Sequence, residues 1–267
     1  MFPVHIWLPE AHVEAPTIGS IILAGVLLKL GLFGLVKFLF PIFAFGSFIF
    51  SPFILILALI GVIYASMSTL IQIDMKKLVA YSSIAHMNFV VLGIFVFNFQ
   101  GFIGGFALML SHGLVSSGLF FCVGVLYERY KTRLLFYLGG LSLFMPLFNF
   151  FIFFFVLSNM SFPGTFSFIG EITILIGVGL KNFMLCFLSG ITMVFAAAYS
   201  LYLYSFVMLG SPRDFFIKKY ADVTKREFVC LFLLAFFTLF LGVFPMYVLD
   251  GFYSMVPFYL DFITTIG

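Results

Sequence analysis

Residues 52–73 read PFILILALIGVIYASMSTLIQI and contain no charged side chain. A helix needs about 20 such residues to cross a hydrocarbon core about 30 Å thick. Within a bilayer, only helices and closed barrels satisfy every backbone hydrogen bond. Strands of a barrel alternate apolar and polar residues, whereas this run is almost continuously apolar. The run therefore predicts a transmembrane α-helix.

The composition extends this prediction to the whole chain. Of the 267 residues, 64% are hydrophobic and 9% are charged, whereas a soluble domain carries about 25% charged residues. Because so few charges cannot keep the surface in water, most of it must face lipid. We therefore expect an all-α fold, a polytopic transmembrane helical bundle that forms a single membrane domain over residues 1–267.

Apolar runs bounded by glycine, proline and charge predict seven spans. They cover residues 15–38, 52–73, 76–97, 101–127, 138–182, 184–209 and 228–249, after an amphipathic segment from His5 to Glu14. The run at 138–182 is too long for one plain crossing and contains Ser161-Phe162-Pro163-Gly164-Thr165. Because proline interrupts helices, we expect a broken helix there. Its break must be surrounded by protein or water, and such breaks usually mark a transport path.

The basic residues test this count of spans. With seven spans, ten Lys and Arg side chains fall on the side where the first span begins, whereas Lys37 and Lys181 fall on the other. Counting the broken helix as two spans would remove this asymmetry. The positive-inside rule then places the basic side in the matrix or cytoplasm and the C-terminus outside. The ten are Lys76, Lys77, Arg129, Lys131, Arg133, Arg213, Lys218, Lys219, Lys225 and Arg226.

Four ionisable residues remain deep inside the predicted spans: Lys29, His86, His112 and Glu171. Lys29 lies roughly 21 Å along its helix, and the two histidines lie roughly 15 Å along theirs. A Lys or Glu at such depth costs at least about 2.5–3.5 kcal/mol on insertion scales, so it should face protein or water. Since all four groups can exchange protons, a row of them joined by water predicts a proton relay.

Each of these residues also has a purely structural explanation. Lys29 could extend its amine to the membrane surface, and Glu171 could bond the broken backbone beside it. His86 and His112 could be neutral polar contacts between helices. We expect no catalytic residue, cofactor, metal, nucleic acid or soluble small-molecule substrate, because no such motif stands out in the sequence.

The cysteines are isolated inside apolar runs. They have no paired spacing, so we interpret them as buried structural thiols rather than metal ligands. They are Cys122, Cys186 and Cys230.

Several segments resemble a known family, NADH dehydrogenase subunit four, an antiporter-like membrane subunit of respiratory complex I. The longest are HIWLPEAHVEAP at 5–16 and LAGVLLKLG at 23–31, followed by AYSSIAHM at 80–87 and HGLVSS at 112–117. Tyr127-Glu128-Arg129, Gly19-Ser20 and the Pro163-Gly164 break leading into Gly170-Glu171 match further family segments. The similarity covers nearly the whole chain and weakens after about Gly210.

The resemblance implies the half of a proton channel that the second inverted repeat builds. Lys29 would lie on the central hydrophilic axis, His86 and His112 in this half, and Glu171 at the exit side. The subunit would carry protons within NADH:ubiquinone oxidoreductase while binding no NADH, flavin or iron–sulfur cluster. The resemblance also implies the mitochondrial inner membrane, with basic loops in the matrix and the C-terminus in the intermembrane space.

The family pattern also divides the chain. Residues 1–14 would be the second part of a broken helix, 15–210 the proton-channel half, and 211–267 a loop and terminal helix. We expect the polar residues of the first motif to pack or form hydrogen bonds around the first broken helix rather than to transfer protons. They are His5, Glu10, His12 and Glu14.

One departure from the family concerns the missing half. In the family, helices carrying an essential glutamate and a lysine precede the first motif, whereas this sequence begins within that motif. We expect either a split gene, with a separate polypeptide supplying the first half, or a fragment. The expected partners are that polypeptide, the other membrane-arm subunits of complex I, and lipids. On this interpretation the chain cannot pump alone.

Two alternatives remain open. One is a subunit of a multi-subunit cation/proton antiporter, which shares much of the same signature. The other is a structural membrane module that does not pump. Retention of Lys29 and Glu171 argues against the second alternative, because a structural role does not require such costly groups.

Overall fold

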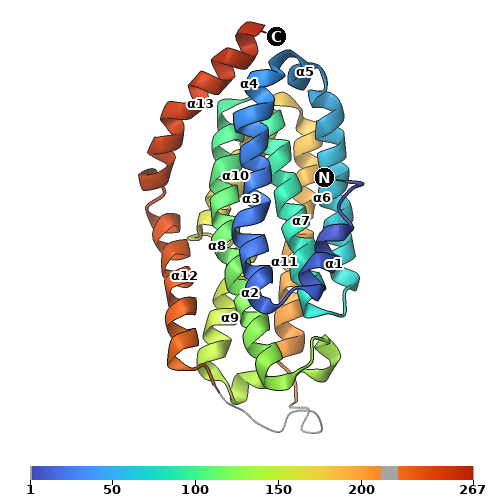
Figure 1. The fold of residues 1–267 in the computed structure, drawn as a ribbon, viewed down its shortest axis with the longest axis vertical. Helices are drawn as coiled ribbons and strands as arrows, with labels where there is room; N and C mark the ends of the chain where they lie inside the picture. The colour runs from blue at the N-terminus through green and yellow to red at the C-terminus, as the bar shows by residue number, and fades with distance from the viewer. Residues whose placement is uncertain (1, 212–221, 267) are drawn as a thin grey trace.

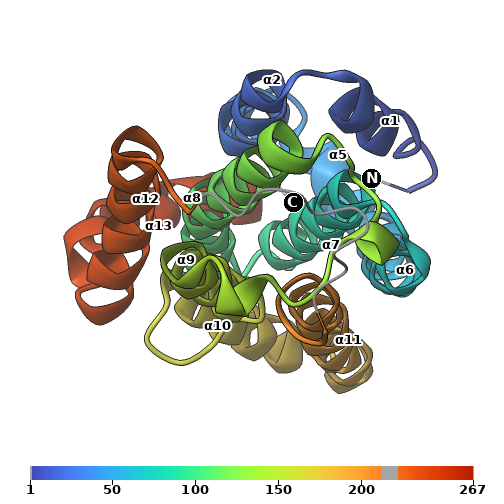
Figure 2. The same cartoon turned by 90° about the horizontal axis from the view of Figure 1, so that it is seen from below.

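The computed structural model describes the backbone of residues 2–211 and 222–266, and the side chains of these residues up to Pro257. Over these residues the chain is a bundle of helices without a sheet (Figures 1 and 2). This arrangement confirms the predicted fold class.

Six helices of the described chain are long and apolar enough to cross a membrane. The first, Thr17–Ile42, is a composite of α2 (Thr17–Ile22), η1 (Leu23–Leu27), α3 (Leu28–Gly34), η2 (Leu35–Leu39) and α4 (Phe40–Ile42). The others are α6 (Ser51–Ile71), α7 (Met75–Phe95), α8 (Phe99–Tyr130), α11 (Phe183–Met208) and α12 (Lys225–Val243). The remaining helices are α1 (Trp7–Glu14), α5 (Ala44–Ile49), α9 (Pro146–Asn159), α10 (Phe166–Lys181) and α13 (Met246–Ile266), with single turns η3 (Leu135–Tyr137) and η4 (Leu141–Leu143).

The predicted broken helix is the pair α9 and α10. Each half is shorter than the about 20 residues that a crossing needs, so together they make the seventh span. Between them, Ser161 has φ 57° and Gly164 has φ 97°. These left-handed conformations interrupt the right-handed helical backbone. The hydroxyl of Ser167 donates to the carbonyl of Ser158 at 2.6 Å, and that of Thr165 donates to the carbonyl of Phe162 at 2.8 Å. Hydroxyl groups therefore satisfy part of the backbone that the break exposes.

The last predicted span differs from the structure. The run 228–249 was expected to be one helix, but α12 ends at Val243 and α13 begins at Met246. Pro245 lies between them, and proline lacks the N–H that a helix interior needs. Helix α13 was not predicted, because its pattern is interrupted by Asp250 and Pro257.

Helices α7 and α8 form the centre of the bundle, with the other spans around them (Figure 2). In α7, 94% of the most apolar window is buried, against 17% in the first span and in α12. The outer faces of these two spans are therefore available to lipid or to other protein. Helix α8 contacts α10 closely through glycine: a Cβ at Gly170 would lie 2.6 Å from the backbone nitrogen of Leu108.

We call the end of the bundle where α2, α7, α9 and α12 begin the basic end, at the bottom of Figure 1. The described residues of the predicted basic set lie there, whereas Arg213, Lys218 and Lys219 lie outside the described residues.

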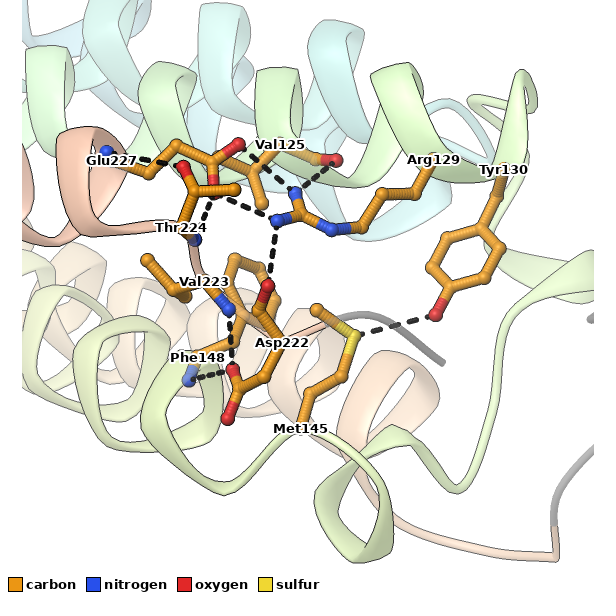
Figure 3. A network of polar contacts seen from close by, with 9 residues as sticks. All are labelled: Val125, Arg129, Tyr130, Met145, Phe148, Asp222, Val223, Thr224 and Glu227. Atoms are coloured by element: carbon orange, nitrogen blue, oxygen red, sulfur yellow. Dashed lines mark hydrogen bonds and ion pairs between the residues drawn. The ribbon is translucent and has the colours of Figure 1, made fainter. Parts of the chain in front are cut away.

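A polar network joins three helix ends at the basic end (Figure 3). Arg129 of α8 donates to both carboxylate oxygens of Glu227 in α12, at 3.2 and 2.7 Å, and to the carbonyl of Asp222 at 2.9 Å. The Asp222 carboxylate accepts from the backbone nitrogens of Leu147 and Phe148 at the start of α9, each at 3.1 Å.

Candidate functional site

Lys29 lies at the start of α3, directly after the wide π-helical turn η1. Its amine donates to the carbonyl of Ala24 and lies 2.9 Å from Nδ1 of His112 on α8. A protonated lysine can only donate, so His112 then accepts at Nδ1 and carries its own proton on Nε2. Small residues permit this contact: a Cβ at Gly113 would lie 3.4 Å from Cε of Lys29.

His86 and Glu171 form the second contact of the site. Nδ1 of His86 on α7 lies 3.2 Å from Oε1 of Glu171 on α10, and both side chains are buried. On the other side of the ring, the hydroxyl of Tyr199 on α11 lies 3.5 Å from Nε2 of His86. Three helices thus converge on the imidazole of His86.

The two contacts meet between the histidines. The ring centroids of His86 and His112 are 5.5 Å apart, with the planes inclined at 47°. The four residues therefore form a continuous row in the order Lys29, His112, His86, Glu171, and we call this set the ionisable row. Nε2 of His112 is buried without a hydrogen-bond partner among the described residues, so one nitrogen of the row is left unpaired.

Two spaces adjoin the ionisable row. A cavity of about 20 Å³ lies against His86, Glu171, Tyr199 and Ser66, and this volume is sufficient for one water molecule. At the other end of the row, an open groove of about 280 Å³ between the first span and α8 reaches Lys29. The row thus runs from an internal cavity to the outer face of the first span.

The structure decides two of the structural alternatives. The Lys29 amine bonds groups inside the bundle, so it does not extend to the membrane surface. The Glu171 carboxylate contacts His86 rather than the broken backbone. The two histidines contact ionisable partners on other helices. Neutral polar contacts between helices and a proton relay would both place the histidines in this way, so the geometry does not separate these two roles.

Tyr199 was not among the predicted residues. Its side chain is fully buried beside His86, but a tyrosine in an apolar run is ordinary in a membrane helix, so the sequence carries no signal for it. The cysteine prediction was partly wrong: Cys122 is buried, Cys186 is half-buried and Cys230 is exposed.

Two histidines of the first motif pack against aromatic rings. The ring of His12 stacks on Phe120 at a centroid distance of 4.6 Å, and the ring of His5 lies 5.2 Å from that of Tyr64. Glu10 is exposed. The motif thus lies beside the ionisable row without belonging to it.

Comparison with known proteins gives one family. Residues 1–197 match the transmembrane family described as NADH:quinone oxidoreductase/Mrp antiporter. The NADH-ubiquinone oxidoreductase chain 4 of Marchantia polymorpha is 51% identical over 96% of this chain and 52% of its own length. The chain thus spans about half the length of the curated relatives it matches.

Solved structures share the fold, among them one of complex I and one of an Mrp complex. A chain of respiratory complex I from Thermus thermophilus superposes with a TM-score of 0.92 and 28% identity, over 98% of this chain and 55% of that one. A chain of the Mrp complex from Dietzia sp. superposes with a TM-score of 0.84 and 16% identity, over 98% of this chain and 55% of that one. At that identity the second likeness concerns the fold alone.

Proposed function

Because this chain belongs to the NADH:quinone oxidoreductase/Mrp antiporter family, we propose that it carries protons through the ionisable row as part of a respiratory complex I. The proposal rests on two contacts, the part-buried contact of Lys29 with His112 and the buried contact of His86 with Glu171. A lysine and a glutamate deep in a membrane bundle are costly, and their placement in one row with two histidines supports a role in proton transfer rather than in packing alone.

Proton transfer needs donor and acceptor within about 3 Å, or one water between them. In the proposed path, the Lys29 ammonium gives a proton to Nδ1 of His112, and the ring releases its other proton from Nε2. In this path, one water between the two rings takes that proton and gives one to Nε2 of His86. His86 then passes a proton from Nδ1 to the carboxylate of Glu171. Each added charge changes the proton affinity of the next group, because charges interact strongly at low dielectric.

We further propose that residues 15–210 form the conducting half of a larger unit. The relatives are about twice as long as this chain, and the first span is only 17% buried. A separate polypeptide, or the rest of a longer chain, would cover the part of this face that surrounds Lys29 and supply the entry-side glutamate and lysine. Other membrane-arm subunits of complex I are the further partners, and no redox cofactor binds this chain.

The distribution of charge supports a proposed orientation. The basic end gathers the described loop cations except Lys37 and Lys181. By the positive-inside rule, this end faces the matrix of a mitochondrion, in the inner membrane. Helix α13 runs toward the opposite end (Figure 1), so the C-terminus would lie on the intermembrane-space side.

A cation/proton antiporter subunit is the second candidate. The description of the matching family, which names the Mrp antiporter, favours it, and the same row would serve that exchange. The two functions differ in their driving force: pumping in complex I requires NADH oxidation, whereas exchange requires only a sodium or potassium gradient.

Replacement of Lys29 by Met tests the proposal. In the purified complex reconstituted into proteoliposomes, Lys29→Met should lower the number of protons pumped per NADH oxidised, because the first donor of the row is lost. The matched control is Lys37→Met on the same span, whose amine lies over the ring of Phe33 at 5.2 Å and outside the row. Unchanged pumping in Lys29→Met would contradict the proposal, and cation-driven proton exchange without NADH would favour the antiporter.

A further inference from the structure

A groove separate from the ionisable row opens at the basic end between α2, α8 and α12. Its volume is about 260 Å³. The walls are largely apolar and come from Ile18 and Ile21 of α2, Phe121 and Val125 of α8, and Cys230 of α12. Where α2 and α8 meet, a Cβ at Gly124 would lie 3.2 Å from Cβ of Thr17, so the two helices close the floor of the groove.

The mouth of the groove carries opposite charges. Glu128 in the last turn of α8 and Arg226 in the first turn of α12 both line it and are both exposed. Neither forms an ion pair with another residue of the described chain. The third charged residue of the mouth, Glu227, is held by Arg129 (Figure 3). The mouth therefore offers one carboxylate and one guanidinium to a ligand.

The position of the groove indicates its occupant. The mouth lies at helix ends beside the other cations of the basic end. In the proposed orientation this end lies at the depth of lipid headgroups, and the apolar walls extend toward the hydrocarbon. Basic pockets between transmembrane helices on this side of a membrane bind lipid headgroups. A ligand that matches the whole groove has an apolar chain, a phosphate for Arg226 and a cation for Glu128.

We propose that this groove binds one phosphatidylethanolamine molecule. Its phosphate contacts Arg226, its ammonium donates hydrogen bonds to Glu128, and one acyl chain lies along Ile18, Phe121 and Cys230. Phosphatidylcholine fits less well, because a quaternary amine has no N–H to donate. Anionic lipids lack the cation and meet the Glu128 carboxylate. The inference rests on the membrane-spanning fold and not on proton conduction.

The test uses the purified complex in vesicles of phosphatidylcholine that contain a small fraction of a photoreactive lipid. This lipid is either phosphatidylethanolamine or phosphatidylcholine, with the same diazirine in the acyl chain near the glycerol. After illumination, mass spectrometry maps the adducts. We expect phosphatidylethanolamine adducts on peptides that contain Ile18, Phe121 and Cys230, at a higher yield than with phosphatidylcholine.

Two variants and two controls decide the outcome. Glu128→Gln should lower the yield of phosphatidylethanolamine adducts about two- to fivefold, because one exposed ion pair contributes about this much to binding. It should leave the yield of phosphatidylcholine adducts unchanged. Arg226→Gln should lower both yields. Lys225→Gln and Glu14→Gln, exposed charges outside the groove, should change neither. Equal yields for both lipids, insensitive to Glu128→Gln, would overturn the proposal, and so would adducts only with a neighbouring polypeptide.

Discussion

His112 connects the two halves of the ionisable row. Its Nδ1 lies 2.9 Å from the amine of Lys29, and its ring lies 5.5 Å from that of His86. Proton transfer through an imidazole requires both ring nitrogens, because one accepts while the other releases. The contacts of His112 therefore predict a specific role, that both of its ring nitrogens transfer protons, which its depth in the membrane alone would not predict.

Replacement of His112 by Phe preserves most of the ring volume and removes both nitrogens. We expect proton pumping per NADH to fall as far as in Lys29→Met, while assembly of the complex is retained. The control is His5→Phe, because His5 packs among Phe2 and Tyr64 outside the row. Pumping in His112→Phe equal to that in His5→Phe would show that the row is not the path.

The sequence predicts which ionisable residues are buried in the membrane, but not which residues they contact. Lys29 and Glu171 stand out because charge is rare in an apolar span. Their contacts with His112 and His86 join residues more than 80 positions apart, so no local pattern reveals them. Tyr199 has no signal, since its hydroxyl acquires a role only from the ring beside it.

Among the helices, the contact between α8 and α10 positions Glu171. Gly170 precedes that glutamate, and its missing side chain lets the α10 backbone approach Leu108 of α8. Close approach through small residues is a common way of packing membrane helices. The register of α10, and with it the reach of Glu171 toward His86, depends on this contact.

Gly170→Ala should therefore separate the two helices. A Cβ there would lie 2.6 Å from the nitrogen of Leu108, and overpacking of this kind costs about 1–3 kcal/mol. The measurement is the temperature at which the solubilised complex loses this chain. In the control Gly190→Ala, a Cβ on α11 would meet nothing within 4 Å, so we expect no shift. Equal thermal stability of both variants would refute this account of the packing.

The sequence predicts the helical elements more reliably than their ends. Apolar length identifies the spans, and Pro163-Gly164 identifies the break between α9 and α10. The closure of that break depends on Gly242 of α12, since a Cβ there would overlap the carbonyl oxygen of Gly164. Such contacts are tertiary, so the sequence does not reveal them. The interruption at Pro245 could have been predicted from the proline itself, but the apolar length of the run outweighed it.

In the molecule as a whole, two outer spans are largely exposed, whereas the central helix α7 is almost fully buried. The first span and α12 are each 17% buried, whereas α7 is 94% buried. The groove that reaches Lys29 lies on one of the open faces. We infer that the ionisable row continues into the protein that covers this face, and that the chain conducts only within the assembled complex.

If the four residues act as one path, the proton stoichiometry of the complex depends on them as a unit. We would measure protons pumped per NADH for Lys29→Met, Glu171→Gln and the double variant in the same reconstituted complex. The effects of replacing groups that act as a unit are strongly non-additive, so we expect the same decrease in all three variants. Two unequal decreases that add in the double variant would contradict it, because Lys29 and Glu171 would then serve separate paths.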